Sequence, residues 1–223
     1  MGLSTALRSP ADAPRRARRK RGRPPVEGLP ARRREQILVA ATRVFADRGY
    51  PGTDVEVIAR RLGIGKGTVY RYFPTKAGLF LAAADRGMRL LSERVRTDCS
   101  NKPDPLERIA TATRSYLSFF DEHPEIVELI IQERAEFRDR KLPTYFQHRD
   151  ANIGPWRALF QDLIAQRRLR SLPVGRVTDV LSDMLYGTIF TNYFSGRRKS
   201  VQSQAEDVID VFFLGILAGR AAK

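Results

Sequence analysis

The sequence predicts an all-α protein of about nine helices, and three observations support this fold class. Apolar residues recur at helical spacing through most of the chain after residue 30. No stretch alternates between apolar and polar residues as a half-buried strand does. Helix-starting residues stand ahead of several periodic segments, as where Asp104 precedes Pro105. With 223 residues, the chain is long enough to bury a core in one large domain or two modest ones.

Residues 1–30 differ from the rest of the chain, and we expect a disordered basic arm there. They contain five of the 13 prolines and almost no large apolar residue, so nothing offsets the entropy of ordering them. Residues 1–34 carry 11 basic and two acidic side chains, whereas the net charge of the whole chain is +15. Because clustered Lys and Arg gain free energy by releasing counterions from phosphates, the arm indicates an anionic partner.

A helix-turn-helix is predicted in the next segment, at residues 31–80. Its first helix ends at Gly49 and places Ile37, Leu38, Ala41, Val44 and Phe45 on one face. Thr53 opens a capping box, Thr-Asp-Val-Glu, and we expect it to cap a second helix of about two turns. Gly63-Ile64-Gly65 then breaks the chain before a short helix at 66–73. Two short helices around such a turn indicate a helix-turn-helix.

The remaining residues, 81–223, are predicted to form a helical domain for effector binding and dimerisation. A long helix capped by Thr75 runs to about Cys99, which is long enough to link two domains. Further helices are expected from about Pro105 to Phe120, Pro124 to Arg138, Thr144 to Arg168, Val174 to Phe194 and Gln202 to Ala221.

The second helix of a helix-turn-helix needs groups that reach phosphates and base edges in the major groove. We expect Val69 and Phe73 to face the core, while the helix start at Thr53 and the cation of Lys76 hold phosphates. The candidate DNA contacts are Thr53, Lys66, Gly67, Thr68, Tyr70, Arg71, Tyr72 and Lys76. The alternatives are that Thr53 only caps its helix, that Tyr70 is mostly core, and that the others form a solvated face.

These residues resemble the DNA-binding region of the TetR family of bacterial transcriptional regulators. The resemblance covers residues 37–80, and in particular Phe45–Tyr50, Thr53, Ile58–Ile64, Gly65–Phe73 and Lys76. It implies an all-helical homodimer on a double-stranded operator with two half-sites, and a carboxyl-terminal domain whose small effector lowers DNA affinity. Gly65 stands where the family commonly has a capping side chain such as Ser, and glycine caps a helix nearly as well. Tyr72 stands where His is frequent.

The arm contains Arg21-Gly22-Arg23-Pro24-Pro25, which resembles the core of an AT-hook. Gly and Pro favour a slim, extended backbone, and Arg21 and Arg23 would enter a narrow A·T-rich minor groove of high negative potential. The alternative is a solvated tail that attracts DNA without sequence preference. Both interpretations add DNA affinity.

The carboxyl-terminal region is rich in aromatic residues and nearly balanced in charge. Residues 88–223 carry 14 of the 20 aromatics, and their net charge is only +3. Such side chains line pockets between helices, although they more often form core. The candidates are Tyr116, Phe119, Phe120, Phe137, Tyr145, Phe146, Trp156, Phe160, Tyr186, Phe190, Tyr193 and Phe194. We expect an apolar or aromatic effector to contact Phe120, Trp156, Tyr186 and Phe190.

The last two predicted helices combine small and apolar residues, which permits close contact between helices. The small residues are Gly187, Thr188 and Thr191 on one helix and Gly215, Ala218 and Gly219 on the other. We therefore expect these helices to form a four-helix interface with a second copy of the chain.

Other classes of function find little support in the sequence. The two histidines, His123 and His148, lie in no motif with nucleophile or metal spacing, so we expect neither an enzyme nor a metal or cofactor site. The charged residues around Glu133 are expected to form a solvated helix face. Cys99 has no partner for a disulfide, the longest apolar run is nine residues, and the arm has no apolar signal segment. We therefore expect a cytoplasmic chain that does not enter a membrane.

Two hypotheses of function remain. The first is a sequence-specific DNA-binding transcriptional regulator, a repressor that a small apolar or aromatic effector releases from its operator. The second is an architectural or nonspecific nucleic-acid-binding dimer without an effector. A cavity among the helices of residues 104–194 would favour the first hypothesis over the second.

Overall fold

Nine helices build the part of the chain that the computed structural model describes, residues 1, 29–196 and 199–217. Their bounds are α1 Leu29–Gly52, α2 Val55–Arg61, α3 Lys66–Tyr72, α4 Lys76–Cys99, α5 Pro105–Glu122, α6 Pro124–Glu136, α7 Thr144–Ala165, α8 Val174–Ser195 and α9 Val201–Ile216. No strand occurs among these residues, whose one isolated β-bridge joins Leu169 to Leu217. The all-α prediction is confirmed.

Two predictions fall on residues that the structure does not describe. The arm at residues 1–30, with Arg21 and Arg23, lies almost wholly outside the described residues. The predicted end of the last helix, at residues 218–221, also lies outside them.

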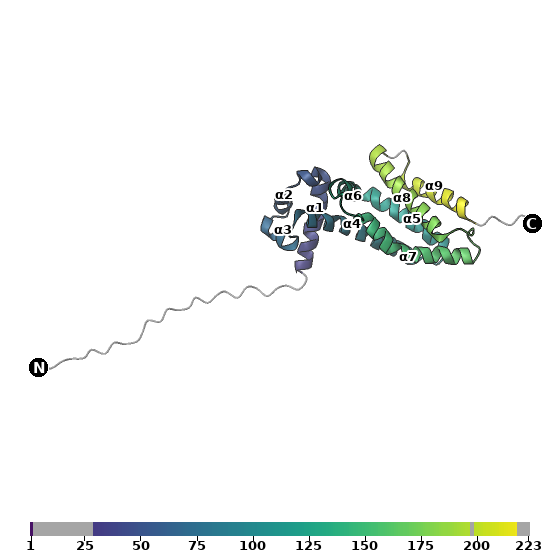
Figure 1. The fold of residues 1–223 in the computed structure, drawn as a ribbon, viewed down its shortest axis with the longest axis horizontal. Helices are drawn as coiled ribbons and strands as arrows, with labels where there is room; N and C mark the ends of the chain where they lie inside the picture. The colour runs from purple at the N-terminus through teal and green to yellow at the C-terminus, as the bar shows by residue number, and fades with distance from the viewer. Residues whose placement is uncertain (2–28, 197–198, 218–223) are drawn as a thin grey trace, which may run out of the picture.

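The first three helices and the start of α4 share a core at one end of the molecule (Figure 1). Phe45 of α1, Ile58 of α2 and Val69 of α3 are fully buried in it. α1 changes direction at Gly49, whose φ of 74° lies in the left-handed region that favours glycine. The predicted break at Gly49 is therefore confirmed, although a short helical segment continues beyond it to Gly52.

The long helix α4 joins this core to the rest of the molecule. Thr75 caps it as predicted, because its hydroxyl oxygen accepts a hydrogen bond from the amide of Gly78 at 2.9 Å. Phe80 is buried in the N-terminal core, and Met88, two turns further on, is buried in a second core. At about 1.5 Å per residue, the 24 residues of α4 span about 36 Å. The predicted domain boundary at residue 80 falls inside this helix and stays a prediction.

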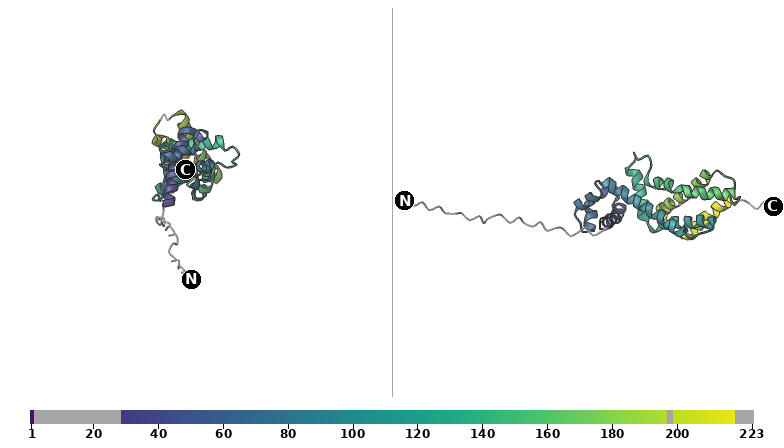
Figure 2. Two further views of the ribbon diagram at one scale, coloured as in Figure 1. Left: turned by 90° about the vertical axis from the view of Figure 1, so that its left-hand side faces the viewer. Right: turned by 90° about the horizontal axis from the view of Figure 1, so that it is seen from below.

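Helices α5, α7, α8 and α9 form the other end of the molecule, and α4 packs along α5 and α7 (Figure 2). Two cores lie among them, one around Phe120 and Ile130 and the other around Phe160. Asp104 caps α5 as predicted, since its carboxylate accepts a hydrogen bond from the amide of Glu107 at 3.1 Å. In this arrangement four helices, α4, α5, α7 and α8, surround a common space.

α6 lies between the two ends of the molecule and contacts both. Leu129 is fully buried in the N-terminal core, and Phe137 stacks on Phe80 with ring centroids 5.4 Å apart. α4 passes close to α6 at Gly87, where an added Cβ atom would lie 2.6 Å from Cδ1 of Ile126. Glycine is therefore required for this close crossing.

Glu133 of α6 corrects the sequence analysis, which expected it on a solvated face. Its side chain is only 1% exposed. Oε1 accepts hydrogen bonds from the amide of Thr144 at 2.9 Å and from its hydroxyl at 3.0 Å, and Arg140 forms an ion pair with it at 3.2 Å. Glu133 thus fastens α6 to the first residue of α7. Its neighbours Arg134 and Glu136 are exposed, so the sequence around it looks like a charged surface.

Replacing Glu133 with alanine should lower the free energy of unfolding by about 3 kcal/mol, because a buried ion pair that loses one partner leaves the other groups unpaired. Urea unfolding followed by circular dichroism measures this change. Glu136→Ala is the matched control, since Glu136 is exposed on the same helix, and should change stability by less than about 0.5 kcal/mol. Equal stabilities for the two variants would contradict the role assigned to Glu133.

Candidate nucleic-acid interface and helical-domain pocket

The helix-turn-helix geometry comes from a short turn between α2 and α3. Gly63 has a φ of 62°, which a residue with a side chain rarely adopts. The amide of Ile64 donates to the carbonyl of Ala59 at 3.1 Å, which closes the end of α2. The next helix starts at Lys66 with Gly65 as its N-cap. Val69 is fully buried, so α3 has one face in the core and the other on the surface.

The exposed face of α3 carries most of the predicted DNA contacts. Gly67, Tyr70 and Arg71 are exposed, whereas Lys66, Thr68 and Tyr72 are partly buried. Tyr70 is therefore a surface residue, and the alternative that it is mostly core is not supported. Tyr72 instead packs against the N-terminal core. As predicted, Phe73 is buried, at 5% exposure.

Asp54 contacts the first residues of both α2 and α3, and the sequence did not indicate it as a site residue. Its Oδ1 accepts hydrogen bonds from the amide of Glu56 and from Nζ of Lys66, both at 2.9 Å. The amide of Glu56 and then the ammonium of Lys66 lower the pKa of Asp54. The same carboxylate raises the pKa of Lys66. Lys66 is therefore held, fully charged, at the first position of α3.

The prediction that Thr53 caps α2 is wrong. The N-cap of α2 is Asp54 rather than Thr53, because only the Asp54 side chain accepts from a free amide of the helix. Thr53 is 2% exposed, and its hydroxyl donates to the carbonyl of Gly49 at 2.7 Å. The hydroxyl therefore joins the end of α1 to the start of α2 and is not presented to a phosphate.

Lys76 stands at the start of α4, close to the end of α1. Its Nζ lies 4.6 Å from the ring centroid of Tyr50 and donates to the carbonyl of Pro51 at 3.3 Å. These two contacts direct a cation towards the segment between α1 and α2, next to the helix-turn-helix.

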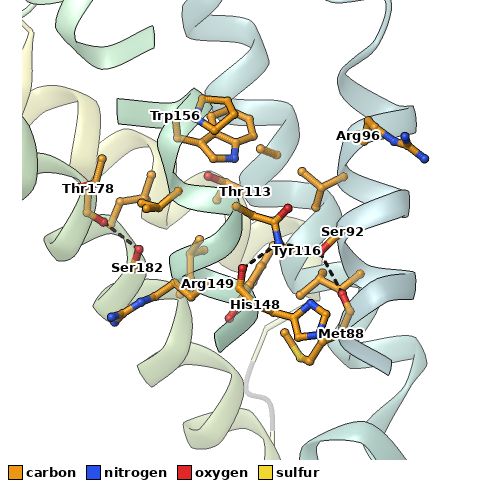
Figure 3. A pocket seen from close by; sticks show the side chains of 18 of the residues that line it. Met88, Ser92, Arg96, Thr113, Tyr116, His148, Arg149, Trp156, Thr178 and Ser182 are labelled. Atoms are coloured by element: carbon orange, nitrogen blue, oxygen red, sulfur yellow. Dashed lines mark hydrogen bonds between the residues drawn. The ribbon is translucent and has the colours of Figure 1, made fainter. Parts of the chain in front are cut away.

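A pocket of about 710 Å³ lies between α4, α5, α7 and α8 (Figure 3). Of the four predicted effector contacts, only Trp156 lines it. Phe120 lines a smaller cavity of about 370 Å³, while Tyr186 and Phe190 are partly buried against the second core, with their ring centroids 4.5 Å apart. These three aromatics therefore belong to other packing sites, which composition and spacing do not distinguish from a pocket.

The polar wall of the pocket includes Tyr116 and Tyr145, two of the predicted candidate aromatics, and His148, which the sequence did not indicate as a site residue. Tyr116 and Tyr145 share a hydrogen bond of 2.7 Å between their hydroxyls. Burial raises the pKa of Tyr145 to about 12 and raises that of Tyr116 well above its ordinary value, so both stay neutral at physiological pH. His148 also lines the pocket, and its Nε2 lies 2.8 Å from Oδ1 of Asp85 in α4.

The described residues contain neither a membrane span nor a candidate metal cluster. None of their helices combines the length and the apolar character needed to cross a bilayer. No group of three His, Cys, Asp or Glu side chains in this part of the chain has positions suited to a metal ion.

The helix-turn-helix region matches a known family. Residues 37–83 fit the family model of bacterial regulatory proteins of the tetR family. The chain belongs to the TetR family. This agrees with the resemblance of the residues around α3 and with the all-helical fold.

Several curated relatives of this TetR-family chain are transcription regulators. The HTH-type transcriptional activator FasR of Mycolicibacterium smegmatis is 33% identical over 100 residues, which cover 45% of this chain and 46% of FasR. The fatty acid metabolism regulator protein of Bacillus subtilis is 31% identical over 83 residues, 37% of this chain and 43% of that protein. The chain thus spans less than half the length of these two relatives. An uncharacterised HTH-type regulator of Mycobacterium tuberculosis is 29% identical over 191 residues, 83% of this chain and 90% of that protein.

Solved structures share the fold along most of its length. The fatty acid degradation regulator FadR of Bacillus halodurans superposes with a TM-score of 0.71 at 16% identity, over 86% of this chain and 97% of FadR. FadR of Bacillus subtilis in complex with stearoyl-CoA has a TM-score of 0.67 at 20% identity, over 80% and 96% of the two chains. At these identities the likeness concerns the fold alone.

Replacing Asp54 with asparagine should tighten binding of this TetR-family chain to duplex DNA of any sequence. Asparagine keeps the helix cap, while the loss of the carboxylate removes a negative charge beside Lys66 and frees the ammonium for phosphate. Fluorescence anisotropy with a random-sequence duplex measures the affinity. Asp210→Asn on α9 makes the same change of net charge at an exposed position at the other end of the molecule, and should leave binding unchanged. Weaker binding by Asp54→Asn than by this control would show that the Asp54 contact assists DNA binding instead.

Proposed function

We propose that this chain is a dimeric, sequence-specific DNA-binding repressor whose operator affinity falls when an apolar or aromatic small molecule occupies the pocket. The position of α4 carries this proposal. Its first residue, Lys76, stands beside the helix-turn-helix, and its residues from Met88 to Arg96 line the pocket. A ligand that displaces α4 therefore changes the placement of α3.

The surface of α3 supports binding in the major groove. Its exposed side carries Gly67, Tyr70 and Arg71, and Lys66 stands at its start with a fixed ammonium. A close backbone approach at glycine and donors on the flanking side chains suit contacts with phosphates and base edges. In this proposal the arm adds affinity through its cations. Minor-groove contacts by Arg21 and Arg23 stay a prediction.

The exposed apolar side chains of α8 and α9 support a homodimer. Phe194 is 67% exposed, Val211 63% and Leu214 74%. A monomer gains nothing by exposing several large apolar groups on adjacent helices, whereas an interface buries them. In a dimer of this kind, two copies of α3 can read two half-sites.

The pocket supports an effector and disfavours the architectural alternative, because a protein that only bends or coats DNA has no use for a cavity of about 710 Å³. The neighbour solved with stearoyl-CoA contains a ligand with a long apolar chain. Here, too, Trp156, Phe160 and Leu181 provide an apolar surface. A tenfold loss of operator affinity requires only about 1.4 kcal/mol of difference between the ligand affinities of the two states.

Changing Lys66 or Thr68 to alanine should reduce the preference for operator over random DNA, by roughly 1 to 3 kcal/mol for each good base contact. An operator is first selected from a pool of random duplexes, and binding is then measured on both DNAs over a range of salt concentrations. Removal of residues 1–28 is the contrasting variant, because it should weaken binding to both DNAs and flatten the salt dependence. Equal losses on both DNAs from the α3 variants would favour the architectural alternative.

Replacing Gly215 with arginine should produce monomers that bind the operator weakly. Gly215 is exposed on α9 with open space around it, so the substitution leaves the fold intact while it places a charge on the apolar face. Sedimentation velocity gives the oligomeric state. Gly154→Arg is the matched control, since Gly154 is exposed on α7 and has similar open space. A Gly215→Arg variant that still sediments as a dimer would exclude this interface.

A further inference from the structure

Most hydroxyl donors of the pocket already have an acceptor, but one does not. The hydroxyls of Thr113, Thr178 and Ser182 donate to carbonyls of their own helices, so their hydrogens are already engaged. The phenols of Tyr116 and Tyr145 differ, because the single hydrogen bond between them uses only one of their two hydroxyl hydrogens. Among the described residues no acceptor takes the second hydrogen. The pair therefore has one unused donor.

The unused donor belongs to a polar end of the pocket. Figure 3 shows Tyr116, His148 and Ser92 near one another, with Met88 beside them, while Trp156 stands on the opposite side of the pocket. Nε2 of His148 is engaged by Asp85, and its Nδ1 has no partner among the described residues. The amide nitrogen of Asn152 donates to the His148 carbonyl at 2.7 Å. One end of a ligand can thus be polar, while the remainder meets an apolar surface.

The arginines that line the pocket are not free to receive a ligand carboxylate, and Nε2 of His148 is already engaged by Asp85. These arginines are paired with carboxylates: Arg89 with Asp85 at 3.1 Å, Arg96 with Glu93 at 3.6 Å and Arg149 with Asp150 at 2.9 Å. Figure 3 shows the guanidinium groups of Arg96 and Arg149 directed away from the centre of the pocket. An anion that left water for this site would lose its hydration without gaining a charged partner.

We propose that the effector is a neutral, mainly apolar molecule with a carbonyl oxygen at one end, which accepts the unused hydrogen bond of the Tyr116–Tyr145 pair. Ketones, esters and lactones belong to this class. The inference rests on the proposed function, because it takes the pocket as the effector site. It goes further by naming the polar group that is recognised and the residues that recognise it.

The place of this contact suits regulation of DNA binding. Tyr145 follows Thr144, which Glu133 ties to α6. On α6 the neighbouring Gln132 donates from Nε2 to the carbonyl of Phe45 in α1 at 2.9 Å. A ligand oxygen that accepts a hydrogen bond from Tyr145 therefore contacts the start of α7. The contacts of Glu133 and Gln132 connect this point to α1, which supports the helix-turn-helix.

Three probes of similar size test the proposal: 2-nonanone, nonane and nonanoate. Trp156 is the single tryptophan and lines the pocket, so its fluorescence reports binding directly. On the wild-type chain the ketone should bind about tenfold more tightly than nonane, as one hydrogen bond in a buried site allows. Nonanoate should bind more weakly than the ketone. In the Tyr116→Phe/Tyr145→Phe variant the advantage of the ketone should disappear, while nonane binding stays the same.

Tyr186→Phe is the matched control, because its ring contacts Tyr145 at 4.8 Å but does not line the pocket, and it should keep the preference for the ketone. Unchanged nonane binding shows that the double variant retains a folded pocket. Tighter binding of nonanoate than of the ketone, or an equal ketone preference in the double variant, overturns this inference and leaves the effector pocket standing. If none of the probes changes Trp156 fluorescence, the effector site itself is wrong, and this inference falls with it.

Discussion

Rings from α1 and from the segment after α6 surround Phe80 of α4, and this packing fixes the DNA-binding helices on the long helix. Phe80 meets Phe45 edge-on at 5.1 Å and Tyr50 at 5.2 Å, and it stacks on Phe137 of the segment after α6 at 5.4 Å. Close-packed rings do not deform continuously. A displacement of α4 must therefore carry α1 along or break this cluster, and both outcomes move the recognition helix.

Polar contacts of α6 extend this connection towards the pocket. Gln132 reaches the backbone of α1, and Glu133 reaches the start of α7. In the described part of the chain, Oε1 of Gln132 and Oε2 of Glu133 are buried without a hydrogen-bond partner. A buried network with unused acceptors is less stable than a fully satisfied one. The contacts that α6 makes with α1 and α7 are therefore only partly satisfied.

The molecule separates three kinds of surface. The end with α3 presents Lys66 and Arg71 and suits a polyanion. The face of α8 and α9 presents large apolar side chains and suits another protein surface. The pocket between them contains neutral polar groups on an apolar wall, and its charged residues are paired near the outside. The proposed function assigns these three surfaces to different partners, namely DNA, a second copy of the chain and a small molecule.

Much of the fold was predictable from the sequence, because helix caps and breaks depend on residues only a few positions apart. Thr75, Asp104 and Gly49 act as their local context indicates. Periodicity likewise predicted that Val69 and Phe73 are core, because one face of a short helix must be buried.

The tertiary structure decided which residues meet across longer separations. Asp54 precedes α2 whereas Lys66 starts α3, and Glu133 lies in α6 whereas Thr144 starts α7, so no period within one helix relates the members of either pair. The aromatic residues show the same limit: Trp156 lines the pocket, whereas Tyr186 and Phe190 are partly buried and pack against the second core. A charged or aromatic side chain is compatible with several environments, and only its neighbours in space select one of them.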